Sequence, residues 1–418
     1  MTKTSSVRPA VISPDASSPT TLTTAPSAML IGMLALLAAI APLATDMYLP
    51  AFPAMAKELG VPATTIQFTL TTFLIGLAVG QLLIGPLSDR LGRRGLLIAG
   101  SVLCGVAGAA CALAPSAELL IVFRFLQGFG GAAGVVLSRA VISDRSAGTA
   151  TAKLFGLMMI IQGVAPVVGP ILGGSLLGLG GWRVVFWALT AIAALTLAGL
   201  LAFVPESLPP AQRRSGGLQT LAHDARYVFG NAHYLGYTLA FAFSMAALFS
   251  YISASPFVLQ NMLGLSTTSY SVAFAVNALG LMAVSALNSG LIDRYGSRRL
   301  LSVGLGLLLA SSLLLLLDVT ALHLPLWPTL LLLFAAVSSL GLILGNASSL
   351  AIAEVRRAAG TGSALLGALQ FGLAALVSPL VGLAGEHSAV PMGLAMLASA
   401  LIAVAALLLT RGPQRRAV

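Results

Sequence analysis

Two ionisable residues stand inside long apolar stretches of the sequence, away from the charged segments that separate these stretches. Asp46 lies near the end of the stretch that begins at Met29, and Arg124 lies six residues after Glu118 inside another stretch. At about 1.5 Å of rise per residue, a helix places Arg124 roughly 9 Å beyond Glu118, at a depth similar to that of Asp46. An ionisable group at this depth is costly in lipid unless it is paired or faces a wet cavity, so both residues indicate a functional site.

An intramembrane carboxylate that opens to water on one side at a time can carry a proton. A nearby cation or a bound cationic substrate competes with that proton, so Asp46 and Arg124 predict exchange of a substrate for protons. A purely structural ion pair is one alternative, and an Asp46 that only marks the membrane interface beside Tyr48 and Pro50 is another. Gln127 follows Arg124 on the same stretch and offers polar contacts to a cavity.

A short charged segment occurs twice, each time between two apolar stretches. The first copy runs from Gly85 to Arg94, and the second, about 204 residues later, runs from Ser289 to Arg299. Just after a helix end, Asp89 can pair with Arg93 or with an arginine of the adjoining half of the molecule. Such clusters predict a cytoplasmic gate that closes when the cavity faces outward. Plain positively charged loops are the alternative, but they leave the repeated Asp-Arg-x-Gly unexplained. The predicted gate residues are Gly85, Asp89, Arg90, Gly92, Arg93, Arg94, Asp293 and Arg294.

A third segment, from Gly163 to Gly174, holds four glycines and two prolines within about three helical turns. Prolines bend a helix, and glycines let a partner helix approach closely, so the segment predicts a kinked contact that acts as a hinge. The general abundance of glycine and proline in transmembrane helices is the alternative, and it accounts for one or two of these residues. The predicted hinge residues are Gly163, Pro166, Gly169, Pro170, Gly173 and Gly174.

The amino-acid composition indicates whether these residues are surrounded by water or by lipid. The chain is 58% hydrophobic and only 8% charged, with a mean hydropathy of +0.98, which predicts an integral membrane protein. The net charge of +10 could suggest a nucleic-acid partner, but Lys and Arg form short clusters without aromatic stacking platforms, and we exclude that class. Cys104 and Cys111 share one apolar stretch and are interpreted as packing residues rather than a disulfide or metal framework.

Twelve apolar stretches are long enough to cross the hydrocarbon as helices, so we predict an all-α fold. They cover residues 28–50, 66–84, 96–114, 118–138, 154–177, 183–204, 236–259, 270–290, 300–317, 326–350, 362–384 and 389–410. An even number places both termini on one face. Nearly all Lys and Arg outside the spans fall on that face, against only Lys57 and Arg183 opposite, so both termini are expected in the cytoplasm.

The stretches divide into two similar sets of six. Ala147-Gly148-Thr149 recurs at residues 359–361, and Gly163 with Pro170 recurs as Gly372 with Pro379 at the same spacing. We expect a disordered cytoplasmic tail at 1–27 rather than a signal peptide, six-helix halves at 28–205 and 235–410, a cytoplasmic central loop at 206–234, and a cytoplasmic tail at 411–418.

These motifs resemble those of a known family. Gly85 to Arg94 resembles the signature loop of the major facilitator superfamily, and Asp293 to Arg299 is similar to its weaker second copy. Arg124 to Gly128 resembles the fourth-span motif of the proton-coupled drug exporters, and Gly163 to Gly174 resembles their antiporter motif in the fifth span. The resemblance extends over essentially the whole chain from Met29 to Arg411, and it implies two pseudo-symmetric halves around a central cavity.

Two further segments resemble one particular group within this family. Thr45 to Pro53, with Pro205 to Pro209 after the sixth span, is similar to the Bcr/CflA group of bacterial multidrug exporters, which includes bicyclomycin and chloramphenicol resistance transporters. This resemblance implies that Asp46 is the proton or substrate carboxylate and Arg124 the coupling arginine. Unlike some multidrug relatives, the first span has no second acidic residue around Ala35 to Ala41, so neutral or zwitterionic compounds suit the cavity better than strongly cationic drugs.

The predicted function is export of small amphipathic drugs across the bacterial cytoplasmic membrane in exchange for protons, by alternating access. We expect a monomer in the lipid bilayer, without a cofactor or metal. A mixed cavity lining is expected from Tyr48, Gln67, Phe73, Gln127, Phe243, Tyr251, Phe257, Asn277 and Gln370. A proton symporter that imports a solute is the alternative with the same fold. A channel is a third class, and an enzyme is disfavoured because the four histidines are scattered over loops without metal-ligand spacing.

Overall fold

A computed structural model describes residues 28–146, 149–213, 217–383 and 387–410, and every regular element in this part of the chain is a helix. The elements are α1 (Ala28–Asp46), η1 (Leu49–Ala51), α2 (Phe52–Leu59), α3 (Ala63–Leu91), α4 (Arg93–Ala112), α5 (Ala117–Arg145), α6 (Thr149–Gly180), α7 (Trp182–Phe203), η2 (Pro210–Gln212), α8 (Gly217–Phe229), α9 (Ala232–Pro256), η3 (Phe257–Met262), α10 (Thr267–Tyr295), α11 (Ser297–Ala321), α12 (Leu326–Glu354), η4 (Arg356–Ala358), α13 (Ala359–Leu380) and α14 (Val390–Leu409). The tails predicted at 1–27 and 411–418 lie outside the described residues.

Twelve helical segments among the described residues are long and apolar enough to cross a membrane, which confirms the predicted number. The first runs from Met29 to Leu59 through α1, η1 and α2, which is longer than the predicted span. The helices extend past the apolar stretches because charged side chains on a terminal turn reach water from a helix as easily as from a loop.

The charged segment from Gly85 to Arg94 is therefore mostly helical, and the prediction that Asp89 follows a helix end is wrong. Residues Gly85 to Leu91 form the last two turns of α3, and Asp89 lies inside the helix rather than after its end. Only Gly92 separates α3 from α4. The second copy has the same form, with α10 ending at Tyr295 and α11 beginning after Gly296.

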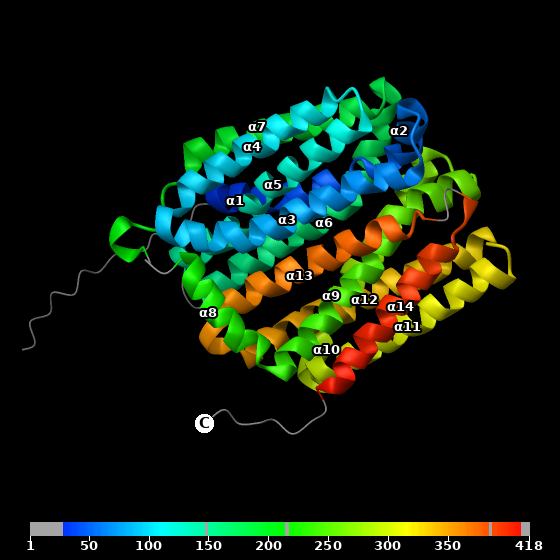
Figure 1. Cartoon of the computed structure of the whole chain (residues 1–418). Helices are drawn as coiled ribbons and strands as arrows, with labels where there is room; N and C mark the ends of the chain where they lie inside the picture. Colours follow the sequence, from blue (N-terminus) through cyan, green and yellow to red (C-terminus); the bar gives the residue numbers. More distant parts are fainter. Residues whose placement is uncertain (1–27, 147–148, 214–216, 384–386, 411–418) are drawn as a thin grey trace, which may run out of the picture.

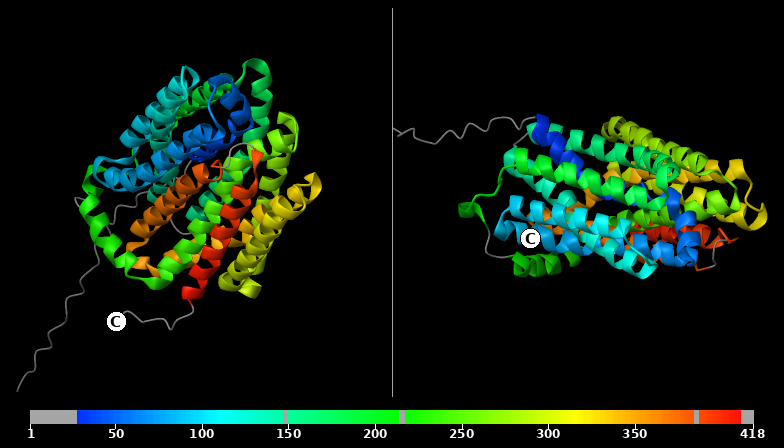
Figure 2. Two further views of the ribbon diagram at one scale, coloured as in Figure 1. Left: turned by 45° about the vertical axis from the view of Figure 1, so that its right-hand side comes forward. Right: turned by 90° about the horizontal axis from the view of Figure 1, so that it is seen from above.

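The spans form two bundles of six that lie side by side (Figures 1 and 2). The first bundle contains α1 to α7 and the second contains α9 to α14. Two seams join them, one between α3 and α13 and the other between α6 and α10. The predicted two-half architecture is confirmed, whereas the residue bounds of the halves remain a prediction.

Glycines let α5 lie at the centre of the first bundle. A methyl group at Gly128 would collide with the Phe73 backbone of α3, and one at Gly134 would collide with the Leu37 carbonyl of α1. On the side of α4, a methyl group at Gly130 would lie 2.7 Å from the backbone nitrogen of Cys104. Three neighbouring helices thus approach the backbone of α5 closely, and one of them, α3, places Phe73 beside the Arg124 side chain that α5 carries.

The two ends of the molecule differ. At one end, which we call the η3 end, α2 and η3 cover the seams between the halves. At the opposite end, which we call the α8 end, the 13-residue helix α8 contacts both α3 and α13 (Figure 1). The sequence analysis did not predict α8, which lies within the segment 206–234 that joins the halves.

Candidate functional site

Asp46 ends α1, at a point where the chain leaves the helix before the short helix η1 begins. Its side chain is buried, with 4% of its surface exposed. Gly169 and Gly173 of α6 bring that helix against this segment. A methyl group at Gly169 would lie 3.2 Å from Cβ of Asp46, and one at Gly173 would collide with the Met47 carbonyl. The glycine-rich segment that predicted a hinge therefore contacts the carboxylate-bearing end of α1.

Asp46 forms no ion pair with Arg124 and interacts electrostatically with tyrosines of the second half. Within the part of the chain that the structure describes, no basic nitrogen lies within 4.0 Å of its carboxylate. It is near enough to Tyr251 of α9 and Tyr270 of α10 for electrostatic interaction. The ion pair with Arg124, one of the alternatives that the sequence left open, is not formed in this conformation.

The two tyrosines that face Asp46 belong to a buried polar group. Asn277 donates from Nδ2 to the Tyr251 hydroxyl at 2.8 Å, and the hydroxyls of Ser255 and Tyr270 lie 3.2 Å apart. Tyr251 and Asn277 were predicted as cavity residues, whereas Ser255 and Tyr270 were missed. The group supplies hydroxyls that can accept or donate a hydrogen bond, which suits either protonation state of a carboxyl group.

Arg124 is fully buried in a cage of aromatic rings. Its guanidinium carbon lies 4.3 Å from the ring centre of Tyr48, 4.1 Å from that of Phe73 and 5.7 Å from that of Phe186. The NH1 group donates to Oε1 of Gln127 at 2.7 Å. Nε and NH2 have no hydrogen-bond partner among the described residues. Ring faces stabilise the cation in place of a carboxylate, and two donor groups stay free for an acceptor.

The remaining predicted cavity residues occupy different places. Gln67 donates to the Ser253 carbonyl across the seam between the halves at 3.1 Å, and Phe257 packs on Phe52 with ring centres 6.0 Å apart. Phe243 and Gln370 are half-buried, and in the described part of the chain neither makes a hydrogen bond or ring contact with Asp46 or Arg124. The structure thus brings Tyr48, Phe73 and Gln127 together around Arg124, and Tyr251 and Asn277 near Asp46.

A second buried carboxylate was assigned wrongly to a loop. The predicted span ended at residue 317, but α11 continues to Ala321, so Asp318 lies inside the helix with 1% of its surface exposed. Its Oδ2 accepts the Thr329 hydroxyl of α12 at 2.7 Å. The carboxylate stands between α11 and α12 and makes no hydrogen bond to the groups around Asp46 or Arg124 among the residues described.

The first copy of the charged motif forms a network within the first half. Arg93 pairs with Asp89 at 2.6 Å and with Asp144 at the end of α5 at 3.1 Å, and it also contacts Ser88. Arg94 donates to the Leu201 carbonyl of α7 at 3.0 Å. The predicted alternative, a pair between Asp89 and an arginine of the second half, is not formed in this conformation.

Glu206 holds this network in place, a role that the sequence analysis missed. Its carboxylate accepts the backbone N–H groups of Arg93 at 2.9 Å and Arg94 at 3.2 Å, and those of Ser207 and Leu208 at 3.0 Å each. Partial burial opposes ionisation, but the N–H donors outweigh it and hold the pKa of Glu206 below its usual range. Glu206 therefore caps the first turn of α4 as an anion, where the helix dipole favours negative charge.

The remaining predicted gate residues are less constrained. Arg90 is exposed and has no ion-pair partner among the described residues, and Gly85 faces Val136 of α5 at ordinary contact distance. In the second copy, Arg294 lies 5.3 Å from the Tyr295 ring centre, and Asp293 forms no ion pair within the part of the chain described. The two copies of one motif thus make different contacts.

Contacts between the halves close the η3 end. Gln260 of η3 donates to the Pro50 carbonyl at 3.2 Å, beside the Phe52 and Phe257 rings and the Gln67 hydrogen bond to Ser253. Asp46 lies below these contacts. The η3 segment is a π-helix, a form that often occurs at functional sites because its loosened backbone bonds allow rearrangement.

Twelve spans in two bundles, with buried charged groups between and within the bundles, define a transporter fold. The model of the Major Facilitator Superfamily matches residues 34–379, and the chain belongs to this family. The chain is 37% identical over 382 residues to the uncharacterized MFS-type transporter YdgK of Bacillus subtilis (strain 168), which covers 90% of this chain and 92% of that protein. It is 30% identical to a bicyclomycin resistance protein homolog of Haemophilus influenzae, which covers 89% and 94% respectively.

Solved structures agree on the fold. A bacterial homolog of the human lysosomal transporter Spinster, in an inward-facing and unoccupied conformation, has a TM-score of 0.70 at 18% identity and covers 91% of this chain and 96% of its own. The predicted resemblance to the Bcr/CflA group is confirmed by the relatives, and the protein is a multi-pass membrane transporter rather than an enzyme.

Proposed function

We propose that this transporter exports small amphipathic drugs from the cell in exchange for protons. The observation that carries the proposal is the buried carboxylate of Asp46, which lies at the contact between the halves without a basic partner among the described residues. A carboxyl group in this place can bind a proton in one conformation and release it when rearrangement changes its neighbours.

Arg124 supplies the second part of the proposed coupling. Its aromatic cage includes Tyr48, which stands two residues from Asp46, so a movement of α1 and η1 changes the surroundings of both groups. The free N–H groups of Arg124 are donors for a carbonyl, nitro or hydroxyl group of a bound drug. A neutral acceptor avoids the cost of burying a second charge, which favours neutral or zwitterionic drugs.

The relatives support the substrate class, since one of them is named for bicyclomycin resistance. We place the α8 end and both termini in the cytoplasm, because this end carries the arginine clusters of both charged motifs. In this orientation the Asp89, Arg93 and Asp144 network serves the cytoplasmic gate, and Gly163 to Gly174 serves as the hinge against α1 and α10.

The test is accumulation of labelled chloramphenicol, bicyclomycin and a cationic dye in bacterial cells that lack their own exporters. Cells with the intact chain are compared with cells that express Asp46→Asn at matched membrane levels, with and without a protonophore. Asp318→Asn is the matched control, because it also removes a buried carboxylate from a span. We expect the intact chain and the control to lower accumulation of the neutral drugs, and both the protonophore and Asp46→Asn to abolish that effect.

Three other outcomes would contradict this proposal. Higher accumulation with the intact chain would identify an importing symporter, and an ohmic, non-saturable flux would identify a channel. Normal export by Asp46→Asn with retained protonophore sensitivity would remove Asp46 from the coupling mechanism.

A further inference from the structure

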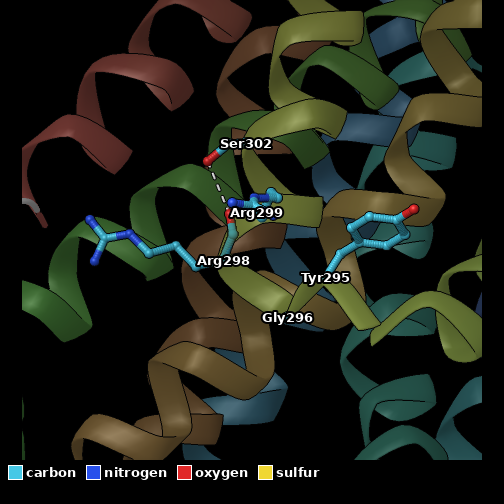
Figure 3. A pocket seen from close by; sticks show the side chains of 5 residues that line it. All are labelled: Tyr295, Gly296, Arg298, Arg299 and Ser302. Carbon is cyan, nitrogen blue, oxygen red and sulfur yellow. Dashed lines mark hydrogen bonds between the residues drawn. The ribbon is translucent and has the colours of Figure 1, made fainter. Parts of the chain in front are cut away.

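The second copy of the charged motif lines a hollow of about 520 Å³ at the α8 end. Its lining residues are Tyr295, Gly296, Arg298, Arg299 and Ser302, at the end of α10 and the beginning of α11. Figure 3 shows Arg298 and Tyr295 extending to opposite sides of the turn at Gly296, with Arg299 between them. Two cationic groups and a phenol thus surround one turn.

Hydrogen bonds fix one of the two arginines of the hollow. Arg298 donates from NH2 to both the carbonyl and the hydroxyl oxygen of Thr410, each at 3.0 Å, and the Ser302 hydroxyl donates to the Arg298 carbonyl at 2.9 Å. Arg299 is exposed and has neither a hydrogen-bond nor an ion-pair partner among the described residues. The site therefore presents an unneutralised charge rather than a closed network.

The first copy of the motif has the opposite arrangement. There the arginine side chain of Arg93 is neutralised by Asp89 and Asp144, and the helix begins under the Glu206 carboxylate. Within the part of the chain described, no carboxylate lies within 4.0 Å of Arg298 or Arg299. Asp293, the acidic residue of the second copy, pairs with neither arginine among the described residues, so the positive charge of both arginines is open to an external anion.

Apolar surface leads from the hollow along both helices. On α10, Leu287 and Leu291 are 63% and 37% exposed and precede Tyr295 at intervals of four residues, which puts all three on one face. On α11, Val303 and Leu307 follow Arg299 at the same interval and are each 49% exposed. Both helices pack on α12. The cationic hollow thus lies at the end of two exposed apolar ridges, Leu287 with Leu291 on α10 and Val303 with Leu307 on α11, which continue into the membrane-spanning part of the molecule.

We propose that this surface binds one anionic phospholipid, with its phosphate on Arg299 and Arg298 and its acyl chains along the ridges of α10 and α11. A free phosphate ion satisfies only the arginines, whereas a phospholipid also covers the exposed leucines and valine. The position at the end of the spans is where basic side chains meet the headgroup layer, and anionic headgroups bind there by charge. The site is independent of the transported substrate, because none of its residues lies near Asp46 or Arg124 in the contacts described above.

The test is lipid retention by the purified chain in mild detergent, measured by native mass spectrometry. The intact chain, Arg299→Gln and the double variant Arg298→Gln with Arg299→Gln are each mixed with phosphatidylglycerol or phosphatidylcholine. Arg90→Gln is the matched control, since it removes an equally exposed arginine from the first copy of the motif. At about fivefold per arginine near an anionic surface, we expect Arg299→Gln to weaken phosphatidylglycerol binding about fivefold and to leave phosphatidylcholine binding unchanged.

Three results would overturn the proposal. Equal phosphatidylglycerol retention by the intact chain and the double variant would remove the arginines from lipid binding. An equal loss in Arg90→Gln would show a general charge effect. Full displacement of the lipid by millimolar inorganic phosphate would identify an ion site instead. Arg299→Gln breaks no hydrogen bond or ion pair among the described residues, and thermal unfolding of each variant checks that its fold is retained.

Discussion

At the scale of single residues, the charged motif depends on one glycine and one carboxylate. Gly92 has φ of +100°, a conformation that L side chains rarely adopt. A methyl group there would also lie 2.6 Å from the Glu206 carboxylate. Glu206 in turn receives four backbone N–H groups, so the two residues fix where α3 ends and α4 begins.

Gly92→Ala is expected to destabilise the protein by about 1 to 3 kcal/mol, because it combines backbone strain with a collision against Glu206. Gly95→Ala is the matched control three residues later, since nothing lies within 4 Å of a methyl group at that position. Thermal unfolding in detergent measures both variants. An equal unfolding temperature for the two alanines would show that the turn tolerates a side chain.

Glu206 also predicts a pH dependence. A carboxyl group whose folded-state pKa is lowered contributes stability above its unfolded value, which is 4.5, and loses it as the pH falls through the lower folded value. The intact chain should therefore lose this contribution only below about pH 4.5, and Glu206→Gln should lack it at all pH values. The difference in unfolding temperature between the two proteins, measured from pH 7 to pH 3, should shrink towards acid. A difference that grows towards acid would contradict the assignment.

At the scale of the elements, the glycines of α6 allow this helix to pack closely against the end of α1. Gly169 and Gly173 are covered by Asp46 and Met47, while Gly163 contacts Met282 of α10 in the other half. One helix therefore touches both halves at positions that allow no larger side chain on the α1 side. This arrangement suits a hinge, since small movements of α6 change the contact with the segment that carries Asp46.

Gly173→Ala should reduce drug export at least tenfold, because a methyl group there collides with the Met47 carbonyl. Gly178→Ala, on the same helix, has nothing within 4 Å of its methyl group and should export normally. Efflux of labelled chloramphenicol at equal membrane levels measures both. Normal export by Gly173→Ala would show that α6 and α1 are not in this contact during transport.

The number and approximate positions of the transmembrane helices could be predicted from the sequence, for physical reasons. Lipid demands long apolar helices, so twelve stretches translate into twelve spans with little ambiguity. Side-chain facing is different, because a span surrounded by lipid and other helices is apolar on all sides and carries little periodic signal. Phe186 and Tyr270 were missed for this reason, and Phe243 and Gln370 were included for the same reason. Glu206 was interpreted only as part of a motif, since two of its four N–H donors, Arg93 and Arg94, reach it only through folding.

At the scale of the whole molecule, side-chain hydrogen bonds between the halves accompany the packing of Phe52 on Phe257 at the closed η3 end. Gln260 to Pro50 and Gln67 to Ser253 are side-chain donors to backbone carbonyls, and each is worth about 1 kcal/mol. Alternating access requires contacts of this kind, since an end sealed by extensive hydrophobic packing could not reopen readily.

Gln260→Ala should shift the population towards opening at the η3 end by about fivefold, the equivalent of one lost hydrogen bond. A cysteine at Ser253, which is fully buried beneath this end, reports the opening through its rate of labelling by a water-soluble maleimide. Ser349→Cys, an exposed position on α12, is the control for reagent access. An unchanged ratio of the two labelling rates would show that Gln260 does not hold the end closed.

The hydrogen bonds of Glu206 also restrain the segment that connects the two halves. The connecting segment begins after α7, but its first residues are fastened to the start of α4 by the hydrogen bonds of Glu206 and by Ser207, which donates to Asp144 at 2.9 Å. Residues Glu206 and Ser207 of this segment are therefore held by the first half. Because α8 contacts both α3 and α13, a displacement of the second half relative to the first must change the contacts of α8 with one of them, close to the charged motif at the end of α3.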